Sequence, residues 1–220
     1  MNKLKESIIN RHSVRAYSDK HIEDAKVAEL QDIILKYNAA SGLNMQLITD
    51  EPEAFNCLLA HYGKFRGVRN YIAMVGPKDQ KEACGYYGER IVLAAQAMGL
   101  NTCWVGLSYK KVKQRYTIGN DEKLHLLIAI GYGTSQGVSH RSKSVADVTI
   151  CKEEMPDWFK AGVEAALLAP TAMNQQKFRF ELIGNKVKAT TFPGFYTKID
   201  LGIAKCHFEI GAEVDKSIWL

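Results

Sequence analysis

The sequence lacks any long apolar run, although 46% of its 220 residues are hydrophobic. Its longest strongly apolar stretch without a formal charge, residues 126–130, falls far short of the roughly 20 residues that cross a bilayer. The stretch up to Arg15 carries charges and no apolar segment of the kind found in secretion signals. We therefore expect no membrane association and a cytoplasmic protein.

Paired cysteines and a dense basic stripe are also missing. The five cysteines lie far apart without a CxxC pair, which predicts reduced structural thiols and neither a disulfide framework nor a zinc site. Lys and Arg outnumber Asp and Glu by 29 to 24, a net charge of +5. Because no Lys/Arg stripe with interleaved aromatics appears, we expect no nucleic-acid partner. The surplus fits either a local anion site or solubility alone.

What the sequence does contain is a mixture of helical and strand patterns. Apolar residues at helical spacing predict helices over 24–37, 87–98 and 199–214, one that starts after Pro156, and a basic helix over 108–116. Strands are expected over 43–49, 71–75, 101–105, 124–130 and 178–183. This mixture predicts a single domain, 1–220, of α+β or mixed α/β class with one dominant sheet.

A weak internal repeat suggests how that domain is organised. Residues 35–48 align without gaps with residues 165–178, and Ala39, Asn44 and Gln46 then meet Ala169, Asn174 and Gln176. Both copies lie where a predicted helix leads to a strand. Duplication would divide the chain into half-units of about 1–146 and 147–220, and chance is the alternative.

The first cluster that could carry chemistry is Arg11, His12, Ser13 and Arg15. In an extended chain alternate side chains face the same way, so Arg11, Ser13 and Arg15 can share one side. Guanidinium groups supply forked, permanently charged donors, which suit a ligand with a phosphate and a planar acceptor edge. Judged on spacing alone, a solvated basic arm is the favoured interpretation.

A second cluster lies where the helix after Pro156 ends. Pro170 closes that helix, and Thr171, Asn174 and Gln176 bring short polar groups to the following turn. Hydroxyl and amide groups both donate and accept, so such a turn could bind a sugar or a polyol. A hydrophilic capping turn fits these residues equally well.

Two further segments are weaker candidates. The predicted strand over 101–105 ends in Val105 and Gly106, where a residue without a Cβ lets backbone N–H groups approach a flat ring closely. The loop that contains Arg141 and Lys143 has anion-binding potential, although such loops are usually only solvated.

Taken in order, these segments resemble the nitroreductase family of FMN-dependent oxidoreductases. RHSVRAYSDKHIE resembles the opening motif of that family, and GERIVLAAQAMGLNTCWVG followed by DEKLHLLIAIGYG resembles its central helix, strand and glycine turn. APTAMNQQKFRFELI resembles its Pro-Ser/Thr-x-x-Asn-x-Gln-Pro segment, and IDLGIAKCHFEIGA its late helix. That proline segment usually follows the first helix, whereas here the better copy starts at Ala169. The arrangement resembles a subgroup with tandem half-units.

The resemblance implies a nitroreductase-like α+β fold, with a mainly antiparallel central sheet flanked by helices, and a set of FMN-binding residues. Arg11 and Ser13, with Arg141 and Lys143, would hold the phosphate and ribityl chain, and Arg15 would face the N1/C2 edge of the ring. The Val105–Gly106 backbone would approach N5. The residues implied to line the ribityl and pyrimidine side are Pro170, Thr171 and Asn174, and the same motifs include His12 and Gln176.

The resemblance also implies an activity. FMN would accept hydride from NADH or NADPH and pass electrons to a nitroaromatic, a quinone or a related small acceptor. Because the flavin carries out the redox step, no catalytic side chain and no metal are expected. The alternatives are a flavin-fragmenting or dehalogenating member of the same superfamily and a non-enzymatic flavin-binding protein.

A homodimer is expected as well, since the family usually builds its flavin site from two subunits. The apolar face of the final helix, with Ile199, Ile203 and Ile210, and the tail 214–220 are the predicted partner surface. Packing of that helix in the chain's own core is the alternative.

Overall fold

The computed structural model describes residues 3–220, which divide by their internal contacts into two units. Unit 2 consists of Asn10–Gln80 and Ile91–Ser139. Unit 1 consists of the described residues up to Ile9, of Lys81–Arg90 and of His140–Leu220. Helix α4 (Lys81–Ala97) therefore contributes to both units.

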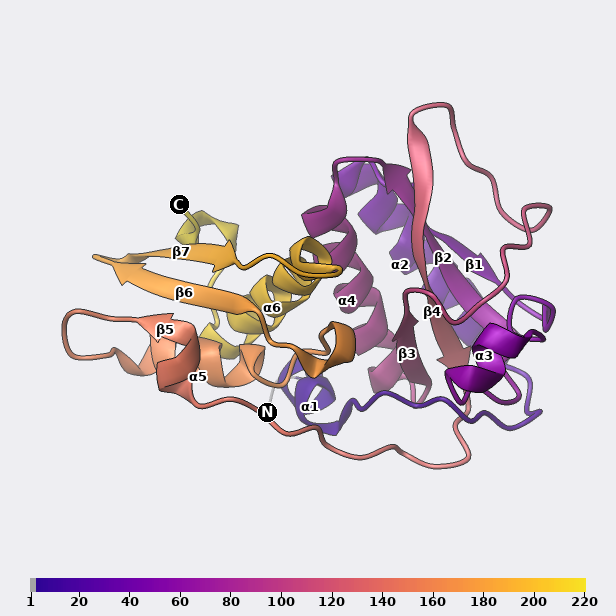
Figure 1. The fold of residues 1–220 in the computed structure, drawn as a ribbon, viewed down its shortest axis with the longest axis horizontal. Coiled ribbons are helices and arrows are strands. Elements are labelled where there is room, and N and C mark those ends of the chain that lie inside the picture. Colours follow the sequence, from indigo (N-terminus) through magenta and orange to yellow (C-terminus); the bar gives the residue numbers. More distant parts are fainter. Residues whose placement is uncertain (1–2) are drawn as a thin grey trace. The chain divides into compact units, whose positions relative to one another are not determined.

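Unit 2 is built on a four-stranded antiparallel sheet with the strand order β1-β2-β4-β3 (Figure 1). Ile72 of β2 lies opposite Ile128 of β4, and the register shifts once between Met74 and Val75. Helix α2 contacts β1. The bounds are α2 (Asp24–Ser41), β1 (Gln46–Ile48), α3 (Leu58–Tyr62), β2 (Asn70–Pro77), β3 (Asn101–Val105) and β4 (Glu122–Gly131).

Strand β2 is buried on both of its faces. Tyr71, Ala73 and Val75 join a core cluster that also contains Phe55 and Phe65. Successive side chains of a strand point to opposite faces, so the intervening Ile72 and Met74, which are also fully buried, lie on the other face. Burial on both faces explains why the central part of this strand is continuously apolar.

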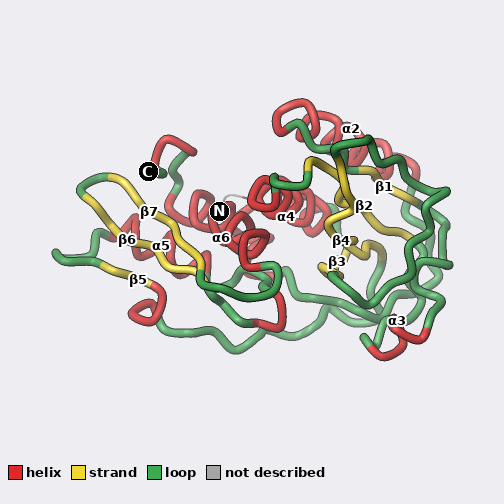
Figure 2. Tube along the Cα trace, turned by 45° about the horizontal axis from the view of Figure 1, so that its top comes forward, coloured by secondary structure: helices red, strands yellow, loops and turns green. Residues whose placement is uncertain are grey.

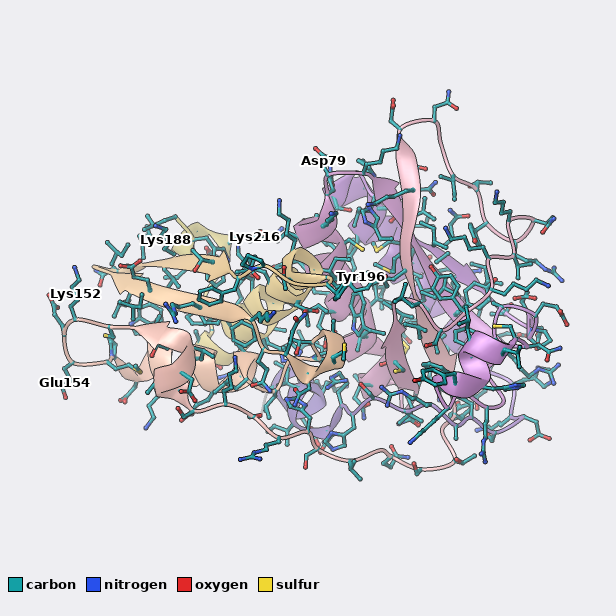
Figure 3. All side chains as sticks on the ribbon, viewed as in Figure 1. Asp79, Lys152, Glu154, Lys188, Tyr196 and Lys216 are labelled. Atoms are coloured by element: carbon teal, nitrogen blue, oxygen red, sulfur yellow. The ribbon has the colours of Figure 1, made fainter. Side chains whose placement is uncertain are left out.

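Unit 1 contains a three-stranded sheet with the order β5-β6-β7, in which β5 pairs parallel and β7 antiparallel with β6 (Figure 2). Helix α6 contacts β6 and β7 and also packs against α5. Charged side chains such as Lys152, Glu154 and Lys188 are exposed (Figure 3). The bounds are α1 (Lys3–Asn10), β5 (Thr149–Ile150), α5 (Asp157–Ala166), β6 (Phe178–Ile183), β7 (Lys186–Thr191) and α6 (Thr197–Ala212), with 3₁₀ turns at Val145–Val148, Ala172–Asn174 and Lys216–Ile218.

Two glycines let α6 pack closely on the first part of α4. A Cβ atom on Gly202 would lie 2.0 Å from the backbone oxygen of Glu82, and one on Gly85 would lie 2.0 Å from that of Ile199. No other residue lacks the Cβ atom, so only glycine fits at either position without a backbone shift.

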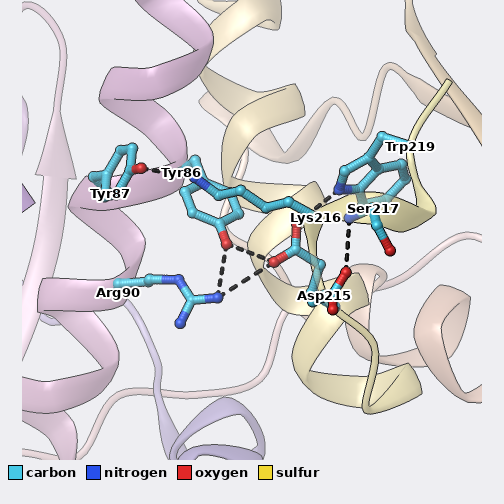
Figure 4. A network of polar contacts seen from close by, with 8 residues as sticks. Tyr86, Tyr87, Arg90, Asp215, Lys216, Ser217 and Trp219 are labelled. Carbon is cyan, nitrogen blue, oxygen red and sulfur yellow. Dashed lines mark hydrogen bonds and ion pairs between the residues drawn. The ribbon is translucent and has the colours of Figure 1, made fainter. Parts of the chain in front are cut away.

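Within unit 1, the C-terminal segment 214–220 makes polar contacts with α4 and α6 (Figure 4), and its indole ring packs on an aromatic side chain. Trp219 Nε1 donates to Glu209 Oε1 at 2.7 Å, and the indole packs 5.2 Å from the ring of Phe208. Glu209 also accepts a hydrogen bond from the Tyr86 hydroxyl at 2.5 Å. Lys216 Nζ donates to the Tyr87 hydroxyl at 2.7 Å.

This packing corrects the predicted partner surface. Ile199, Ile203 and Ile210 are only 3%, 2% and 8% exposed, so the apolar face of α6 is covered by the chain itself. The indole of Trp219 is likewise engaged within unit 1. The apolar face of α6 therefore no longer argues for a partner, and core packing of that helix is the correct interpretation, whereas Leu220 of the tail is 68% exposed.

The predicted fold class is confirmed: the chain combines helices with a four-stranded antiparallel sheet, and in the smaller sheet only the pair β5–β6 is parallel. Two details of the prediction were wrong. The strands form two sheets, one in each unit, and the segment 108–116 is irregular instead of helical. Within residues 3–220 no helix is both long enough and apolar enough to cross a membrane. The half-units expected at about 1–146 and 147–220 stay a prediction.

Candidate functional site

The predicted flavin residues fall into two sets, one in each unit. In unit 2, residues after α1 run extended beside strand β3. Ser13 forms a parallel bridge with Thr102, and the Val14 amide donates to the Thr102 oxygen at 3.0 Å. Val14 is buried in the core cluster of this unit. Since side chains alternate along an extended chain, the residues on either side of Val14 point away from that core.

Arg11, Ser13 and Arg15 all act on the thiol of Cys103 on β3. Burial raises the pKa of this thiol, whereas the charges of Arg15 and Arg11 and a hydrogen bond with Ser13 lower it. The hydrogen bond places Ser13 at the sulfur atom, and the two guanidinium groups act on it through their charge. The prediction that these alternate residues can share a side is therefore consistent with the structure.

The three side chains differ in their exposure. Arg11 is only 3% exposed, whereas Arg15 is exposed and its guanidinium carbon lies 5.9 Å from the centre of the Phe65 ring. His12 is half-buried, and its Cβ lies close to Gly137, where an added methyl group would approach it to 2.8 Å.

Val105 and Gly106 lie at the end of β3. The Val105 side chain is 3% exposed and belongs to the core of unit 2. Only backbone groups at this position could therefore face a ligand, in agreement with the role that the resemblance implies for them.

In unit 1, the predicted residues form a hydrogen-bonded network centred on Gln176, which is only 2% exposed. Gln176 Nε2 donates to the Arg141 backbone oxygen at 2.9 Å and to Asn174 Oδ1 at 2.8 Å, and Oε1 accepts from the Lys143 amide at 2.9 Å. Thr171 Oγ1 accepts from the Gln176 amide at 3.1 Å. These groups join the turn to the loop at Arg141.

The hydrogen bonds of this network bear on the two interpretations of the turn, a polyol-binding turn and a hydrophilic capping turn. Asn174 Nδ2 donates to the Arg141 oxygen at 2.8 Å, and Lys143 Nζ donates to the Gln176 oxygen at 2.9 Å. These donors therefore shape the loop and the turn themselves. Arg141 takes part in the network through its backbone oxygen and is itself exposed. Pro170 is buried beneath the turn.

The same turn carries unusual backbone strain. Met173, Asn174 and Gln176 have φ angles of 51°, 54° and 44°, in the left-handed region that favours glycine. Each such residue costs on the order of 1–2 kcal/mol unless the surroundings hold it there. Strained residues persist at positions where the surrounding structure over-determines the conformation, and Met173 is held in this state although it is 94% exposed.

Asp200 and Gln175 hold the turn and were not among the predicted site residues. Asp200, in the first turn of α6, accepts from the Ala172 amide at 3.0 Å and from Gln175 Nε2 at 2.8 Å. Burial raises the pKa of Asp200 to about 6, although both hydrogen bonds lower it. No local pattern identifies this pairing, because Asp200 and Ala172 lie 28 residues apart.

The family described as "Putative TM nitroreductase" matches residues 3–212. A crystal structure of a "putative nitroreductase" from Thermotoga maritima has a TM-score of 0.71 and 23% identity, and covers 96% of this chain and 83% of its own.

Two other solved structures show the same fold over a smaller part. A "putative nitroreductase in complex with fmn" from Desulfovibrio desulfuricans has a TM-score of 0.53 and 22% identity, over 71% of this chain and 99% of its own. A "Putative NADH dehydrogenase/NAD(P)H nitroreductase" from Parabacteroides distasonis has a TM-score of 0.52 and 21% identity, over 67% of this chain and 97% of its own.

No curated protein matches the sequence. At these identities the solved structures establish the fold, and they agree with the α+β architecture and its antiparallel sheet. The family match extends from the start of α1 to the end of α6 and so includes both sets of predicted flavin residues. This chain therefore belongs to the nitroreductase family.

Proposed function

We propose that the protein is an FMN-dependent oxidoreductase that uses NADH or NADPH to reduce small acceptors such as nitroaromatics or quinones. The observation that carries the proposal is that the extended segment with Arg11, Ser13 and Arg15 runs beside β3, where Ser13 is hydrogen-bonded to Cys103 and both arginines act on it through their charge. These side chains provide two permanent cations and a hydroxyl. Such donors suit a ligand that carries a phosphate ester and a planar heterocycle. The bound flavin would supply hydride and electron transfer.

Within this proposal, each residue of the unit 2 set has a separate task. Arg11 is buried, so its charge acts in surroundings where an anion is screened less by water. Arg15 is exposed beside Phe65, where it can stabilise negative charge on a neighbouring ring edge. Ser13 is held in place by the bridge of its backbone to Thr102.

The residues of the unit 1 set keep the assignment that the resemblance gives them. Arg141 and Lys143 would bind phosphate and ribityl oxygens, and Pro170, Thr171 and Asn174 would line the ribityl and pyrimidine side. The hydrogen bonds of Gln176 and Lys143 within the turn support a role in shaping it.

The first test is an equilibrium titration of the folded apoprotein with FMN, followed by flavin fluorescence. We expect saturable binding that weakens in Arg11→Ala and Ser13→Ala. Lys188→Ala is the matched control, because Lys188 is an exposed cation of β7 outside both sets. A folded protein that binds no FMN would refute the proposal.

The second test separates this activity from the alternatives. Anaerobic addition of NADH or NADPH should bleach the visible spectrum of the holoprotein, and a nitroaromatic or a quinone should restore it. Bleaching without transfer to any acceptor would favour a non-enzymatic flavin protein. Loss of intact FMN after aerobic reduction, detected by mass spectrometry, would favour a flavin-fragmenting enzyme.

The proposal includes a homodimer and a cytoplasmic location. Leu58, Leu59 and Tyr62 of α3 are 86%, 58% and 89% exposed and offer apolar surface to a second copy. The cysteines at positions 57, 84, 103, 151 and 206 are all free thiols, as expected in a reducing compartment.

A further inference from the structure

We infer that Asp200 is a positioning residue that holds the strained turn 171–176 in the form that binds flavin. This inference rests on the proposed function. Asp200 lies on α6, outside the predicted set of FMN-binding residues. Its role would be to maintain the backbone conformation of the turn.

The contacts of Asp200 reach both ends of the 3₁₀ turn Ala172–Asn174. Its Oδ1 accepts from the Ala172 amide at 3.0 Å, where the turn begins, and its Oδ2 accepts from Gln175 Nε2 at 2.8 Å, just after the turn ends. Gln175 Nε2 also donates to the Phe195 oxygen at 2.7 Å. One carboxylate thus fixes two points of the turn against the start of α6.

Two of the three strained residues of the turn lie between these two points. Met173 and Asn174 have positive φ angles, and neither is a glycine. Met173 is exposed and its side chain cannot anchor the conformation by burial. Asn174 makes two side-chain hydrogen bonds: its Nδ2 donates to the Arg141 oxygen at 2.8 Å, and its Oδ1 accepts from Gln176 Nε2 at 2.8 Å. The two contacts to Asp200 therefore act together with the hydrogen bonds of Gln176 in opposing relaxation of the turn to ordinary φ values.

The position of Asp200 also explains why a carboxylate stands there. The side chain is only 4% exposed, and a buried carboxylate is unfavourable unless it is hydrogen-bonded. Its two oxygens accept from two donors, a backbone N–H and a side-chain amide. A carboxylate accepts through both oxygens, whereas an asparagine would offer a single acceptor and turn an NH₂ group toward another donor.

The experiment measures hydrogen exchange and FMN affinity on the same variants. In the apoprotein, Asp200→Ala should increase exchange in peptides that cover 170–177, with no change in peptides from β2 and β4. In the FMN titration, Asp200→Ala should raise the dissociation constant about tenfold or more, as expected for loss of contacts to a charged group.

Asp200→Asn serves as the conservative variant, because it is isosteric and keeps one acceptor for the Ala172 amide. We expect it to show a smaller effect in both measurements. Asp215→Asn is the matched control: its carboxylate also accepts from a backbone amide, that of Ser217 at 2.8 Å, but it lies in the C-terminal segment. It should behave as wild type.

Three outcomes are decisive. Faster exchange confined to the turn, together with weaker FMN binding, supports the inference. Faster exchange with unchanged FMN affinity, or exchange that rises throughout the protein, overturns it. A wild-type protein that binds no FMN refutes the proposed function itself, which distinguishes that failure from a failure of the variants alone.

Discussion

Arg15 and Arg141 are both exposed arginines of predicted flavin motifs, but their surroundings differ. Arg15 lies on the extended segment beside β3, near Cys103 and Phe65. Arg141 lies on a loop whose backbone oxygen accepts from Asn174 and Gln176. At the residue scale the two positions therefore predict different consequences of losing the same guanidinium group.

Replacing Arg15 with alanine should lower the flavin reduction potential and the activity more than it lowers affinity for the phosphate. A cation at the N1/C2 edge stabilises negative charge on the reduced ring, and a hydrogen bond to a charged group contributes about 1.5–3 kcal/mol. Arg141→Ala should do the reverse. Equal effects of both variants on the reduction potential and on the FMN dissociation constant would contradict the assignment of Arg15 to the ring and of Arg141 to the phosphate.

The raised pKa of Asp200 predicts a pH dependence of stability. Its pKa is about 6 in the folded protein and 3.8 in the unfolded chain, so the folded state binds the proton more tightly. The free energy of unfolding should therefore rise as the pH falls through 6, and this contribution is complete only below about 4.

When the pH falls from 7 to 5, the free energy of unfolding of wild type should increase by about 1 kcal/mol relative to that of Asp200→Asn. The reason is that pH 5 lies about one unit below the pKa of Asp200 in the folded protein. Urea unfolding of both proteins at the two pH values measures the difference. The carboxylates whose pKa values are lowered, Glu23, Asp147 and Asp215, lose their contribution only at lower pH and are present in both proteins. Parallel pH profiles would contradict the prediction.

At the scale of elements, the crossing of α4 and α6 in unit 1 depends on glycine. Alanine usually stabilises the interior of a helix relative to glycine by about 0.5–1 kcal/mol, so intrinsic propensity favours its substitution at Gly202. The close approach of the Glu82 oxygen has the opposite effect, because a methyl group cannot fit there without a shift of the backbone.

Gly202→Ala should therefore destabilise the protein by about 1–3 kcal/mol, the usual effect of overpacking. Thermal or urea unfolding gives the measurement. Gly119→Ala is a suitable control, since an added methyl group there meets only the end of the flexible Glu122 side chain, at 3.1 Å. Unchanged or increased stability of Gly202→Ala would show that the crossing is not as tight as described.

For the whole molecule, the expected homodimer now depends on α3 instead of the final helix. Light scattering of the holoprotein at several concentrations should give twice the chain mass of 24.6 kDa. Because Leu58 and Tyr62 lie four residues apart and share one face of the helix, Leu58→Glu with Tyr62→Glu should shift the mass toward that of one chain. A mass of one chain throughout for wild type would exclude the dimer.

Much of the fold could be predicted because local patterns are sufficient for it. Strands β3 and β6 have the predicted bounds, and α2 and α6 lie within a few residues of theirs. The spacing of apolar residues along these segments already defines which face is buried. Alternation in an extended chain likewise predicts that Arg11, Ser13 and Arg15 can share a side, and all three act on Cys103 in the structure.

The segment 108–116 shows where local patterns fail. Its polar spacing suits a helix, but Tyr109 and Tyr116 are buried in the core of unit 2, and the Lys110 amide donates to the Ala54 oxygen at 2.7 Å. These contacts join residues far apart in the chain and override a weak helical preference.

By itself, the sequence determined the α+β class, most helices and strands, and the family to which the chain belongs. Only the tertiary structure decided that α6 is covered by its own chain, that Gln176 shapes its turn and that Asp200 holds it. The reason is physical: helix and strand periodicity follows from neighbouring residues, whereas a hydrogen bond such as that of Ala172 to Asp200 exists only once distant segments have packed together.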